Sequence, residues 1–336
     1  MSKLIVPEGY TSPLTVYETQ RAIEQLRLRF VGHLTKALNL CRASAPLFVA
    51  PETGLNDDLN GVERPVEFDI PATGGRGQIV QSLAKWKRYA LGQYGFSQGE
   101  GLYTEMNAVR RDEELDNLHS VYVDQWDWEK VISPDQRNLD YLRQTVEQIV
   151  DAICTTQEEV LSLFPQLGKD RLSRQISFVT TQELEDLYPE LSPKQREERY
   201  VKEHPTTFLM QIGGPLKSGQ PHDGRAPDYD DWQLNGDILF WNPVLQCAHE
   251  ISSMGIRVDR HSLDRQLTLS GQDGRRVLPF HKMLLEGRLP LTMGGGIGQS
   301  RLCMLLLRKA HIGEVQVSIW DQETAAGCKK AGITLL

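Results

Sequence analysis

The chain has 336 residues, of which 40% are hydrophobic and 24% are charged, and its formal net charge is −8. This balance excludes a disordered or fibrous chain, and the length suits one large domain or two closely packed ones. An acidic chain is a poor non-specific binder of nucleic acid, because neutralising phosphates requires clustered Lys and Arg side chains.

The five cysteines are widely spaced, odd in number and include no Cys-x-x-Cys pair. This argues against a disulfide framework and against a thiolate zinc site. The N-terminal sequence MSKLIVPEGY has no apolar leader region, and no run approaches the roughly 18 apolar residues of a membrane span. We therefore expect a cytoplasmic protein with no membrane partner and no nucleic-acid partner.

The first predicted element is an amphipathic helix over about residues 15–40, where apolar side chains recur at three- and four-residue spacing. Thr15 and Glu18 form a capping-box pattern at its start. Strands are predicted next at Ala45–Val49 and Val66–Ile70, where apolar residues alternate or are bounded by proline.

Ser82 is predicted to cap a short helix that carries Lys85, Lys87 and Arg88, of which at least one is expected on a solvated face. Two strand patterns follow, joined by the charged loop RDEELDNL, and an antiparallel pair is the simplest interpretation. These strands are Leu102–Arg110 and His119–Trp128.

The second half of the chain alternates between helical and strand patterns without a repeat or an obvious linker. Adjacent antiparallel strands with helices gathered between them favour a single α+β domain over residues 1–336 rather than βαβ units. A glycine-rich turn is expected to lead into the last helix. The elements are helices at Asp140–Phe164, from Ser192 with Pro193 at its first position, and at Gln299–Lys309; strands at Thr206–Ile212, Asp237–Val244 and Glu250–Val258; and a turn at Gly294–Gly298.

Three clusters of polar residues could carry chemistry, although each one alone is as well explained by a hydrated surface. In the strand beginning at His119, alternation places Gln125 and Asp127 on one face, and Trp126 and Trp128 are expected in the core. A second cluster holds four aspartates in ten positions, followed by an acid at residue 250. Its members are Asp228, Asp230, Asp231, Asp237 and Glu250.

Acids at the edges of neighbouring strands can share Mg²⁺, which takes oxygen ligands and often keeps substrate phosphates in its shell. In the third cluster, Ser253 and Arg257 fall on one strand face, where Arg257 could hold a carboxylate in a bidentate manner. Glycines before Arg301 could expose backbone N–H groups to an anion at a helix start.

The order of these features resembles the catalytic core of class II aminoacyl-tRNA synthetases. Arg110 resembles the arginine of their second motif, and His119, Val123 and Asp127 keep the spacing that follows it, with Val in place of Phe. The run GIGQSRLCMLLL, which contains Arg301, resembles their third motif. The resemblance implies a central antiparallel sheet of six to seven strands, flanked by helices, that binds ATP.

Seven ordered blocks narrow the resemblance to one family, the ammonia-dependent asparagine synthetases. The blocks are SLAKWKR, GEGLYTEM, LHSVYVDQWDWE, APDYDDW, LNGDI, SSMGIRV and GGGIGQSRL, and the similarity covers about Tyr17–Trp320. The resemblance implies a ligase that adenylates the β-carboxylate of aspartate with ATP and lets ammonia displace AMP. It also implies a homodimer, with the helix at about 15–40 at the interface.

The resemblance assigns roles to residues. Arg110 and Arg301 would bind the ATP phosphates together with His119, although Arg111 stands beside Arg110, and Asp237 and Glu250 would bind Mg²⁺. Lys87 and Arg257 would hold the α-carboxylate of aspartate, and either Asp127 or Asp230 its ammonium group. Ser82, Gln125 and Ser253 complete the aspartate site, and Asp57 could accept a proton from the incoming ammonia.

Other interpretations stay open. A truncated aspartyl-tRNA synthetase paralogue would share every adenylate-forming residue, although an anticodon-binding module is missing. A synthetase-like sensor of aspartate, asparagine or ATP is the non-catalytic alternative. The segment between Asp231 and Asn235 is shorter than is usual for the family, which bears on turnover more than on identity. Ammonia is the expected nitrogen donor, because no N-terminal cysteine is present to hydrolyse glutamine.

Overall fold

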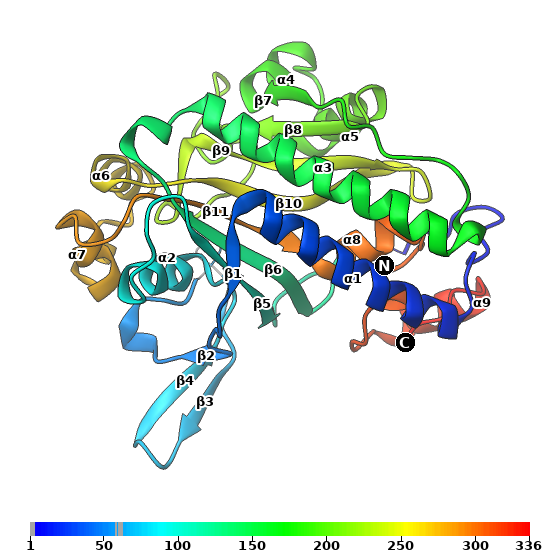
Figure 1. Cartoon of the computed structure of the whole chain (residues 1–336), viewed down its shortest axis with the longest axis horizontal. Helices are drawn as coiled ribbons and strands as arrows, with labels where there is room; N and C mark the ends of the chain where they lie inside the picture. Colours follow the sequence, from blue (N-terminus) through cyan, green and yellow to red (C-terminus); the bar gives the residue numbers. More distant parts are fainter. Residues whose placement is uncertain (1–3, 58, 60–62) are drawn as a thin grey trace.

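The fold is built on one long sheet, seen in a computed structural model that describes residues 4–57, 59 and 63–336. The strand order is β1-β5-β6-β11-β10-β9-β8-β7 (Figure 1). The strands in this order are Leu40–Arg42, Gly101–Val109, Tyr122–Val131, Thr292–Gly298, Cys247–Arg257, Asp230–Asn242, Thr206–Met210 and Ser177–Thr180.

The sheet is mixed, so the prediction of a purely antiparallel sheet of six to seven strands is wrong in pairing and in strand number. The six inner strands are antiparallel, but β1 runs parallel to β5, and β7 runs parallel to β8. The two additional edge strands have only three and four residues, which is too short for an alternation pattern to reveal. The α+β class agrees with the expectation.

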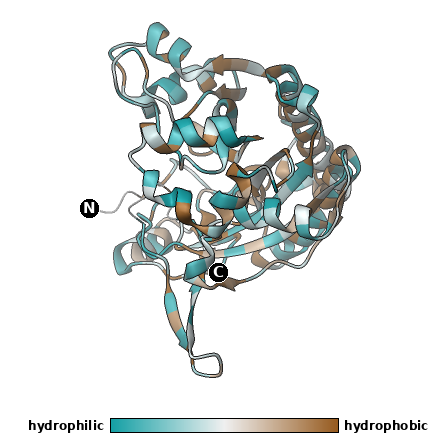
Figure 2. Ribbon diagram, turned by 90° about the vertical axis from the view of Figure 1, so that its left-hand side faces the viewer, coloured by the Kyte–Doolittle hydropathy of each residue, from teal (hydrophilic) through white to brown (hydrophobic). Residues whose placement is uncertain are grey.

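Two long helices, α1 (Val16–Leu38) and α3 (Leu139–Leu163), lie side by side across one face of the sheet (Figure 1). The buried stripe of α1 includes Phe30, whose ring centroid lies 4.8 Å from that of Trp126 on β6. Trp128 is also fully buried in this core, which confirms the expectation for both tryptophans. In Figure 2 the helices change between hydrophilic and hydrophobic along their length, as amphipathic helices do.

Seven further helices are described, some on the faces of the sheet and some beside it. They are α2 (Ala84–Gln93), α4 (Thr181–Leu187), α5 (Pro193–Glu203), α6 (Arg260–Leu269), α7 (Pro279–Leu285), α8 (Gln299–Leu306) and α9 (Gln322–Lys330). Across residues 4–57, 59 and 63–336, none of the helices has both the length and the apolar character that crossing a bilayer requires.

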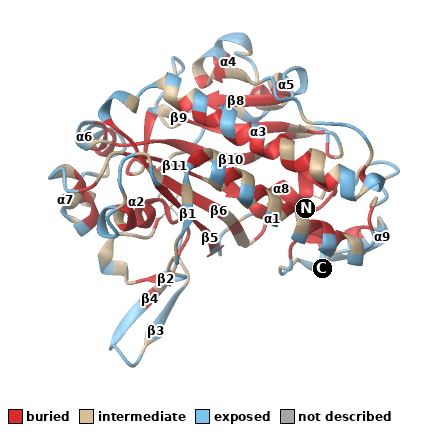
Figure 3. Cartoon of the chain, in the orientation of Figure 1, coloured by how far each residue is buried: buried red, intermediate tan, exposed pale blue. Residues whose placement is uncertain are grey.

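A small second sheet, with the order β2-β4-β3, carries a hairpin that projects from the body and is largely exposed (Figure 3). Its strands are Phe48–Val49, Gly75–Ile79 and Glu67–Ile70. The rings of Phe48 and Phe68 pack edge to face across it, with centroids 5.0 Å apart. The hairpin thus has a small apolar contact of its own.

The helix starts test the capping predictions. Thr15 and Glu18 form the predicted reciprocal box, with the Glu18 amide donating to Thr15 Oγ1 at 3.2 Å. The prediction for Ser82 holds in part: α2 begins at Ala84 and its backbone N-cap is Leu83, but Ser82 Oγ accepts from the Ala84 amide at 3.2 Å. The prediction of a glycine-rich turn is wrong, because residues 292–298 form the central strand β11.

Candidate active site

A cavity of about 380 Å³ opens against β6, β10 and β11, on the face opposite α1. Trp126 contacts Phe30 of α1, so its neighbours Gln125 and Asp127 point to the other side of the strand, into the cavity. Eleven of the residues proposed from the sequence line it: Ser82, Lys87, Arg110, His119, Gln125, Asp127, Asp230, Glu250, Ser253, Arg257 and Arg301.

Glycines of β11 make the room for these side chains. A Cβ atom on Gly296 would lie 2.3 Å from Gln125 Oε1, and one on Gly294 would lie 1.9 Å from Glu129 Oε2. Such distances cannot exist between non-bonded atoms, so both side chains would have to move, and at Gly294 the backbone carbonyl of Trp128, 2.6 Å away, would have to move as well. The glycines are therefore needed because polar side chains of neighbouring strands cross over β11. This is why the prediction of a turn, which was based on the glycines alone, failed.

One end of the cavity contains a buried network of alternating charges. Lys87 Nζ on α2 pairs with Asp127 and donates to the Gly295 carbonyl at 2.9 Å. Arg257 pairs with Asp230 and donates to Glu129, with Nη2 2.7 Å from Oε2. These side chains are nearly inaccessible to solvent, so the network is a rigid surface that presents both positive and negative charges, called the two-sign network below.

Burial dominates the pKa values of two members of this network. It lowers the pKa of Lys87, although Asp127 acts in the opposite direction, and it raises the pKa of Asp230 against the effect of Arg257. A zwitterion contributes one positive and one negative group. Such a ligand could exchange partners with the pairs at little electrostatic cost, because each buried charge would keep a counter-ion.

The basic residues of α2 correct a second expectation, since Lys85, Lys87 and Arg88 are all buried and none lies on a solvated face. Arg88 Nη1 donates to the Val258 carbonyl at 2.6 Å, and Lys85 Nζ lies 3.1 Å from Asp228 Oδ2. The helix is packed between the sheet and α7. The composition of this short helix, with its several cations, therefore led to a wrong prediction of which side chains are buried.

Asp228 is fully buried rather than part of a hydrated acidic loop. Its Oδ2 also accepts from Arg275 Nη1 at 2.7 Å and lies 2.9 Å from His281 Nε2. Burial opposes ionisation, but Lys85, His281 and Arg275 together hold the pKa of Asp228 well below its usual value. The contacts of Asp228 join α2 and α7 to the segment that leads into β9.

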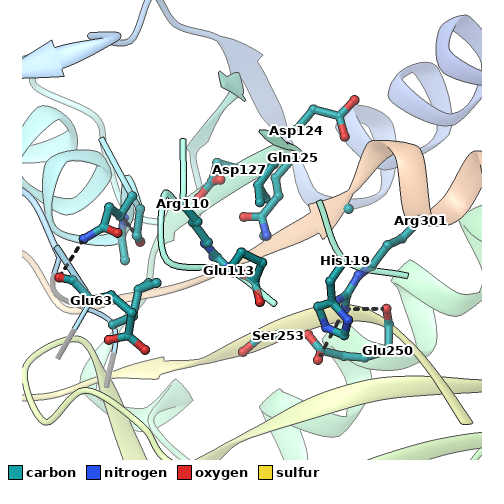
Figure 4. A pocket seen from close by; sticks show the side chains of 18 of the residues that line it. Glu63, Arg110, Glu113, His119, Asp124, Gln125, Asp127, Glu250, Ser253 and Arg301 are labelled. Atoms are coloured by element: carbon teal, nitrogen blue, oxygen red, sulfur yellow. Dashed lines mark hydrogen bonds and ion pairs between the residues drawn. The ribbon is translucent and has the colours of Figure 1, made fainter. Parts of the chain in front are cut away.

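Cationic side chains gather at the other end of the cavity (Figure 4). Arg301 Nη1 lies 3.2 Å from the Glu250 carbonyl oxygen and 3.5 Å from Glu250 Oε2, and His119 points toward the same carboxylate. Arg110 Nη1 is 3.9 Å from Glu113 Oε2. Among the described lining residues Arg110 is present and Arg111 is not.

The two proposed metal ligands lie on adjacent strands, where Asp237 is opposite Ser253 and Glu250 is opposite Leu239. Asp237 is covered by Arg225, which pairs with it and lines the cavity, whereas Asp237 is absent from the described lining. The described residues contain no group of three or more His, Cys, Asp or Glu side chains arranged as a metal cluster.

The electrostatics of these two acids nevertheless suit a divalent cation. Burial and the neighbouring Glu250 raise the pKa of Asp237 to about 7, against the effect of Arg225. Burial also opposes ionisation of Glu250, but Arg301 and Arg225 lower its pKa to about 2. Magnesium usually binds one or two protein carboxylates together with substrate phosphates, so this pair fits a metal shared with a nucleotide.

Asp57 does not line the cavity, although its neighbour Leu59 does. The Asp57 carbonyl accepts from Gln81 Nε2 at 2.8 Å, and Asp57 Oδ1 accepts from the Leu59 amide at 3.1 Å. These contacts place it against Gln81 and Leu59, which line the cavity. Its proposed role in proton transfer stays a prediction.

Sequence reasoning missed Arg225, Asp223 and Tyr229, which also line the cavity. They belong to an irregular segment rich in glycine and proline, where no periodicity marks which side chains point inward. The signal that the sequence offered for Arg225 was its position directly before the block APDYDDW. Chain distance is a weak guide in a segment without regular structure.

Comparisons with known proteins identify the family. The family model for aspartate-ammonia ligase matches residues 17–332. The aspartate–ammonia ligase of Bacillus cereus strain G9842 is 58% identical over 326 residues, which is 97% of this chain and 99% of the relative. The enzyme of that name from Bacillus thuringiensis strain Al Hakam shows the same identity and coverage.

Solved structures agree on the fold. An asparaginyl-tRNA synthetase from Pyrococcus horikoshii, complexed with asparaginyl-adenylate, has a TM-score of 0.67 and 16% identity, covering 90% of this chain and 68% of that one. An aspartyl-tRNA synthetase from Entamoeba histolytica has a TM-score of 0.60 and 16% identity, covering 91% and 59%. At such identities the likeness concerns the fold alone, and it confirms the class II synthetase-like core. The chain belongs to the aspartate–ammonia ligase family.

Proposed function

We propose that this chain is an ATP-dependent ligase that converts aspartate and ammonia to asparagine. The observation that carries the proposal is the meeting, in one cavity, of a buried two-sign network and a separate cationic group. The first contains Lys87 and Arg257, and the second contains Arg110 and Arg301. The 58% identity to proteins named aspartate–ammonia ligase supports it independently.

Aspartate would bind at the two-sign end. Lys87 and Arg257 would attract its α-carboxylate, and Asp127 or Asp230 its ammonium group, so that the bound zwitterion completes the pairs. Gln125 on β6 and Ser253 on β10 lie on the two strands that flank β11, and they would direct the β-carboxylate toward the nucleotide end. Ser82, near the start of α2, would complete the site.

Activation of the β-carboxylate would then consist of positioning and charge neutralisation. A β-carboxylate oxygen attacks the α-phosphorus of ATP, the bond to pyrophosphate breaks, and β-aspartyl-adenylate forms. Negative charge moves onto the phosphate oxygens during this step, where Arg110, Arg301 and His119 would stabilise it. Because these side chains are already held in the cavity wall, little reorganisation is needed.

The second step makes the amide. The ammonia nitrogen attacks the β-carbonyl carbon, the bond to AMP breaks, and one proton leaves the nitrogen. We assign Asp57 as the candidate acceptor of this proton because it contacts Leu59 and Gln81, which line the cavity. Burial of the adenylate would keep water from competing with ammonia.

Asp237 and Glu250 are the residues that would hold Mg²⁺, which supplies charge neutralisation to the phosphate oxygens when it is bound. For Asp237 to act as a ligand, Arg225 has to leave its carboxylate. The carboxylate of Glu250, whose side chain is 40% exposed, is the more accessible of the two.

Three further parts of the proposal concern the whole molecule. Residues 1–336 would form one catalytic domain, located in the cytoplasm, where its five free thiols would stay reduced. The enzyme would be a homodimer with α1 at the interface. The outer face of α1 exposes Tyr17 and Leu28, at 71% and 66%, which supports contact with a second copy.

The test is a product balance. Purified protein supplied with ATP, Mg²⁺, aspartate and ammonium should yield asparagine, AMP and pyrophosphate in equal amounts. Formation of ADP instead would remove the adenylate step. Equilibrium sedimentation, run in parallel, distinguishes a dimer from a monomer.

A further inference from the structure

The loop between β5 and β6 supplies several walls of the nucleotide end, including Arg110, Glu113 and His119 (Figure 4). Within the loop, Asp116 Oδ1 accepts from the backbone amides of Leu118 and His119 at 2.7 and 2.8 Å. The Asp116 carboxylate also lies 2.9 Å from His119 Nδ1. These bonds shape the loop, but they do not join it to the body of the protein.

Asn117 makes one of the connections to the body, beside the ion pair of Asp112 with Arg64 and the hydrogen bond from Ser120 Oγ to Ser318 Oγ at 2.7 Å. Its Oδ1 accepts from the Ile5 amide at 2.7 Å, and its Nδ2 donates to the carbonyl oxygens of Ile5 at 2.8 Å and Ala310 at 2.7 Å. The Asn117 carbonyl oxygen accepts from the Ile312 amide at 2.9 Å. The residue is 2% exposed. Both amide hydrogens and the amide oxygen of its side chain form hydrogen bonds with two distant backbone segments.

The two segments that Asn117 contacts are themselves held together by buried polar contacts. Tyr10 Oη donates to the Glu314 carboxylate at 3.0 Å, and Glu314 Oε1 accepts from the Ala310 amide at 2.8 Å. Lys309 Nζ donates to Ser12 Oγ at 2.7 Å. The N-terminal segment, residues 4–14, is thereby fixed against the chain that follows α8, near the C-terminal end (Figure 1).

We propose that Asn117 is a positioning residue for the nucleotide: through Ile5 and Ala310 it holds the loop that presents Arg110 and His119, and it thereby sets the affinity for ATP. This inference rests on the proposed function, because it assumes that those two side chains bind phosphate. It adds a role for the N-terminal segment, whose Ile5 backbone contacts the loop through this amide side chain.

The physical reason is the preorganisation of a charged loop. Arg110 and His119 are partly exposed, and a loop with several charges would sample many conformations if it were released from the body. Each productive binding event would then require the loop to be ordered again. Aspartate contacts strands and α2 instead, so its affinity should be insensitive to this loss.

The test compares three full-length variants by aspartate-dependent ATP–pyrophosphate exchange. Asn117→Ala should raise KM for ATP about tenfold, a loss comparable to one or two net hydrogen bonds, and should leave KM for aspartate within about twofold. Ile5→Pro removes the amide donor, fixes φ and replaces a side chain that is 48% exposed, and it should give a smaller change in the same direction. The combined variant should be less than additive, because both changes remove the same bond.

Gln157→Ala is the matched control, because Gln157 is also a buried amide that holds a loop, accepting from the Leu172 amide at 2.8 Å far from the cavity. It should lower Tm without changing either KM. Hydrogen exchange across residues 110–119 gives a readout besides activity, and exchange should accelerate in Asn117→Ala but not in the control.

The outcomes separate the two levels of the proposal. An unmodified protein without aspartate-dependent exchange overturns the proposed function itself. An active protein in which Asn117→Ala and Ile5→Pro leave KM for ATP and hydrogen exchange unchanged overturns the positioning role alone. Equal increases in KM for both substrates would also contradict it, since that result indicates a general loss of structure.

Discussion

Arg225 pairs with Asp237 and lies between this carboxylate and the cavity, so the proposed metal ligand is already occupied by a protein cation. An arginine can satisfy the charge of a buried acid while no other cation is bound. Any Mg²⁺ that uses Asp237 has to displace it, which couples the arrival of the metal to movement of the segment that carries Arg225.

The first prediction concerns Asp237→Asn. The substitution keeps the shape of the side chain but removes the negative charge, so turnover should fall at least about a hundredfold and the dependence on Mg²⁺ should weaken. Circular dichroism should show an intact fold. A near-normal rate at ordinary Mg²⁺ concentrations would remove Asp237 from the site.

The second prediction concerns Arg301→Ala, which should lower kcat about a hundred- to a thousandfold, or roughly 2.7–4 kcal/mol, as for the loss of one preorganised charge-stabilising donor. Arg308→Ala is the control just beyond the end of the same helix. Arg308 pairs with the exposed Asp170, and such surface pairs contribute about 0–1 kcal/mol. If the two variants had equal kcat, Arg301 would have no special role.

The third prediction tests the glycine strand. Gly294→Ala would place a Cβ atom 1.9 Å from Glu129 Oε2 and 2.7 Å from Arg257 Nη2. The displaced Arg257 should raise KM for aspartate about tenfold or more, together with a loss of about 1–3 kcal/mol in stability.

Gly32→Ala is its counterpart, because nothing lies within 4 Å of a Cβ atom at this helical position. It should stabilise the protein by about 0.5–1 kcal/mol through helix propensity, without affecting KM. Thermal unfolding and steady-state kinetics measure both variants. An unchanged KM in Gly294→Ala would show that β11 tolerates a side chain there.

The fourth prediction concerns pH. Partial burial opposes ionisation of Asp116, but hydrogen bonds from His119 and from the Leu118 amide outweigh it and lower its pKa from 3.8 to about 2. A lowered acid pKa stabilises the folded state above pH 3.8, and this contribution disappears as the pH falls through about 2.

Asp116→Asn should therefore cost about 1 kcal/mol at pH 6, allowing for solvent screening of a side chain that is 30% exposed. The difference from the unmodified protein should narrow below about pH 4. Urea unfolding at several pH values measures it, and a difference that stays constant down to pH 3 would contradict this assignment.

Long periodic elements were predictable from the sequence because their apolar stripes are strong local signals. Thr15 and Glu18 marked the start of α1, and the alternation around Trp126 correctly separated the core face of β6 from the cavity face. Eleven proposed residues meet in one cavity because the resemblance preserved the order of whole motifs, which local patterns alone do not provide.

Three of the failures have a common physical cause, since each depended on contacts between distant parts of the chain. The burial of Lys85 requires Asp228, which lies 143 positions away. Glycine is required in the strand at position 294 because the Glu129 side chain crosses over it, and this contact is visible only in the folded chain. Arg225 pairs with an acid on a strand, while its own segment has no regular structure to predict its direction.

Aspartate-dependent ATP–pyrophosphate exchange in the absence of ammonia tests the central claim most directly, because only reversible formation of an adenylate moves label from pyrophosphate into ATP. We predict exchange that requires aspartate and Mg²⁺ and that is lost in Arg301→Ala. Asparagine synthesis by the unmodified protein without any such exchange, or exchange that does not depend on aspartate, would contradict it.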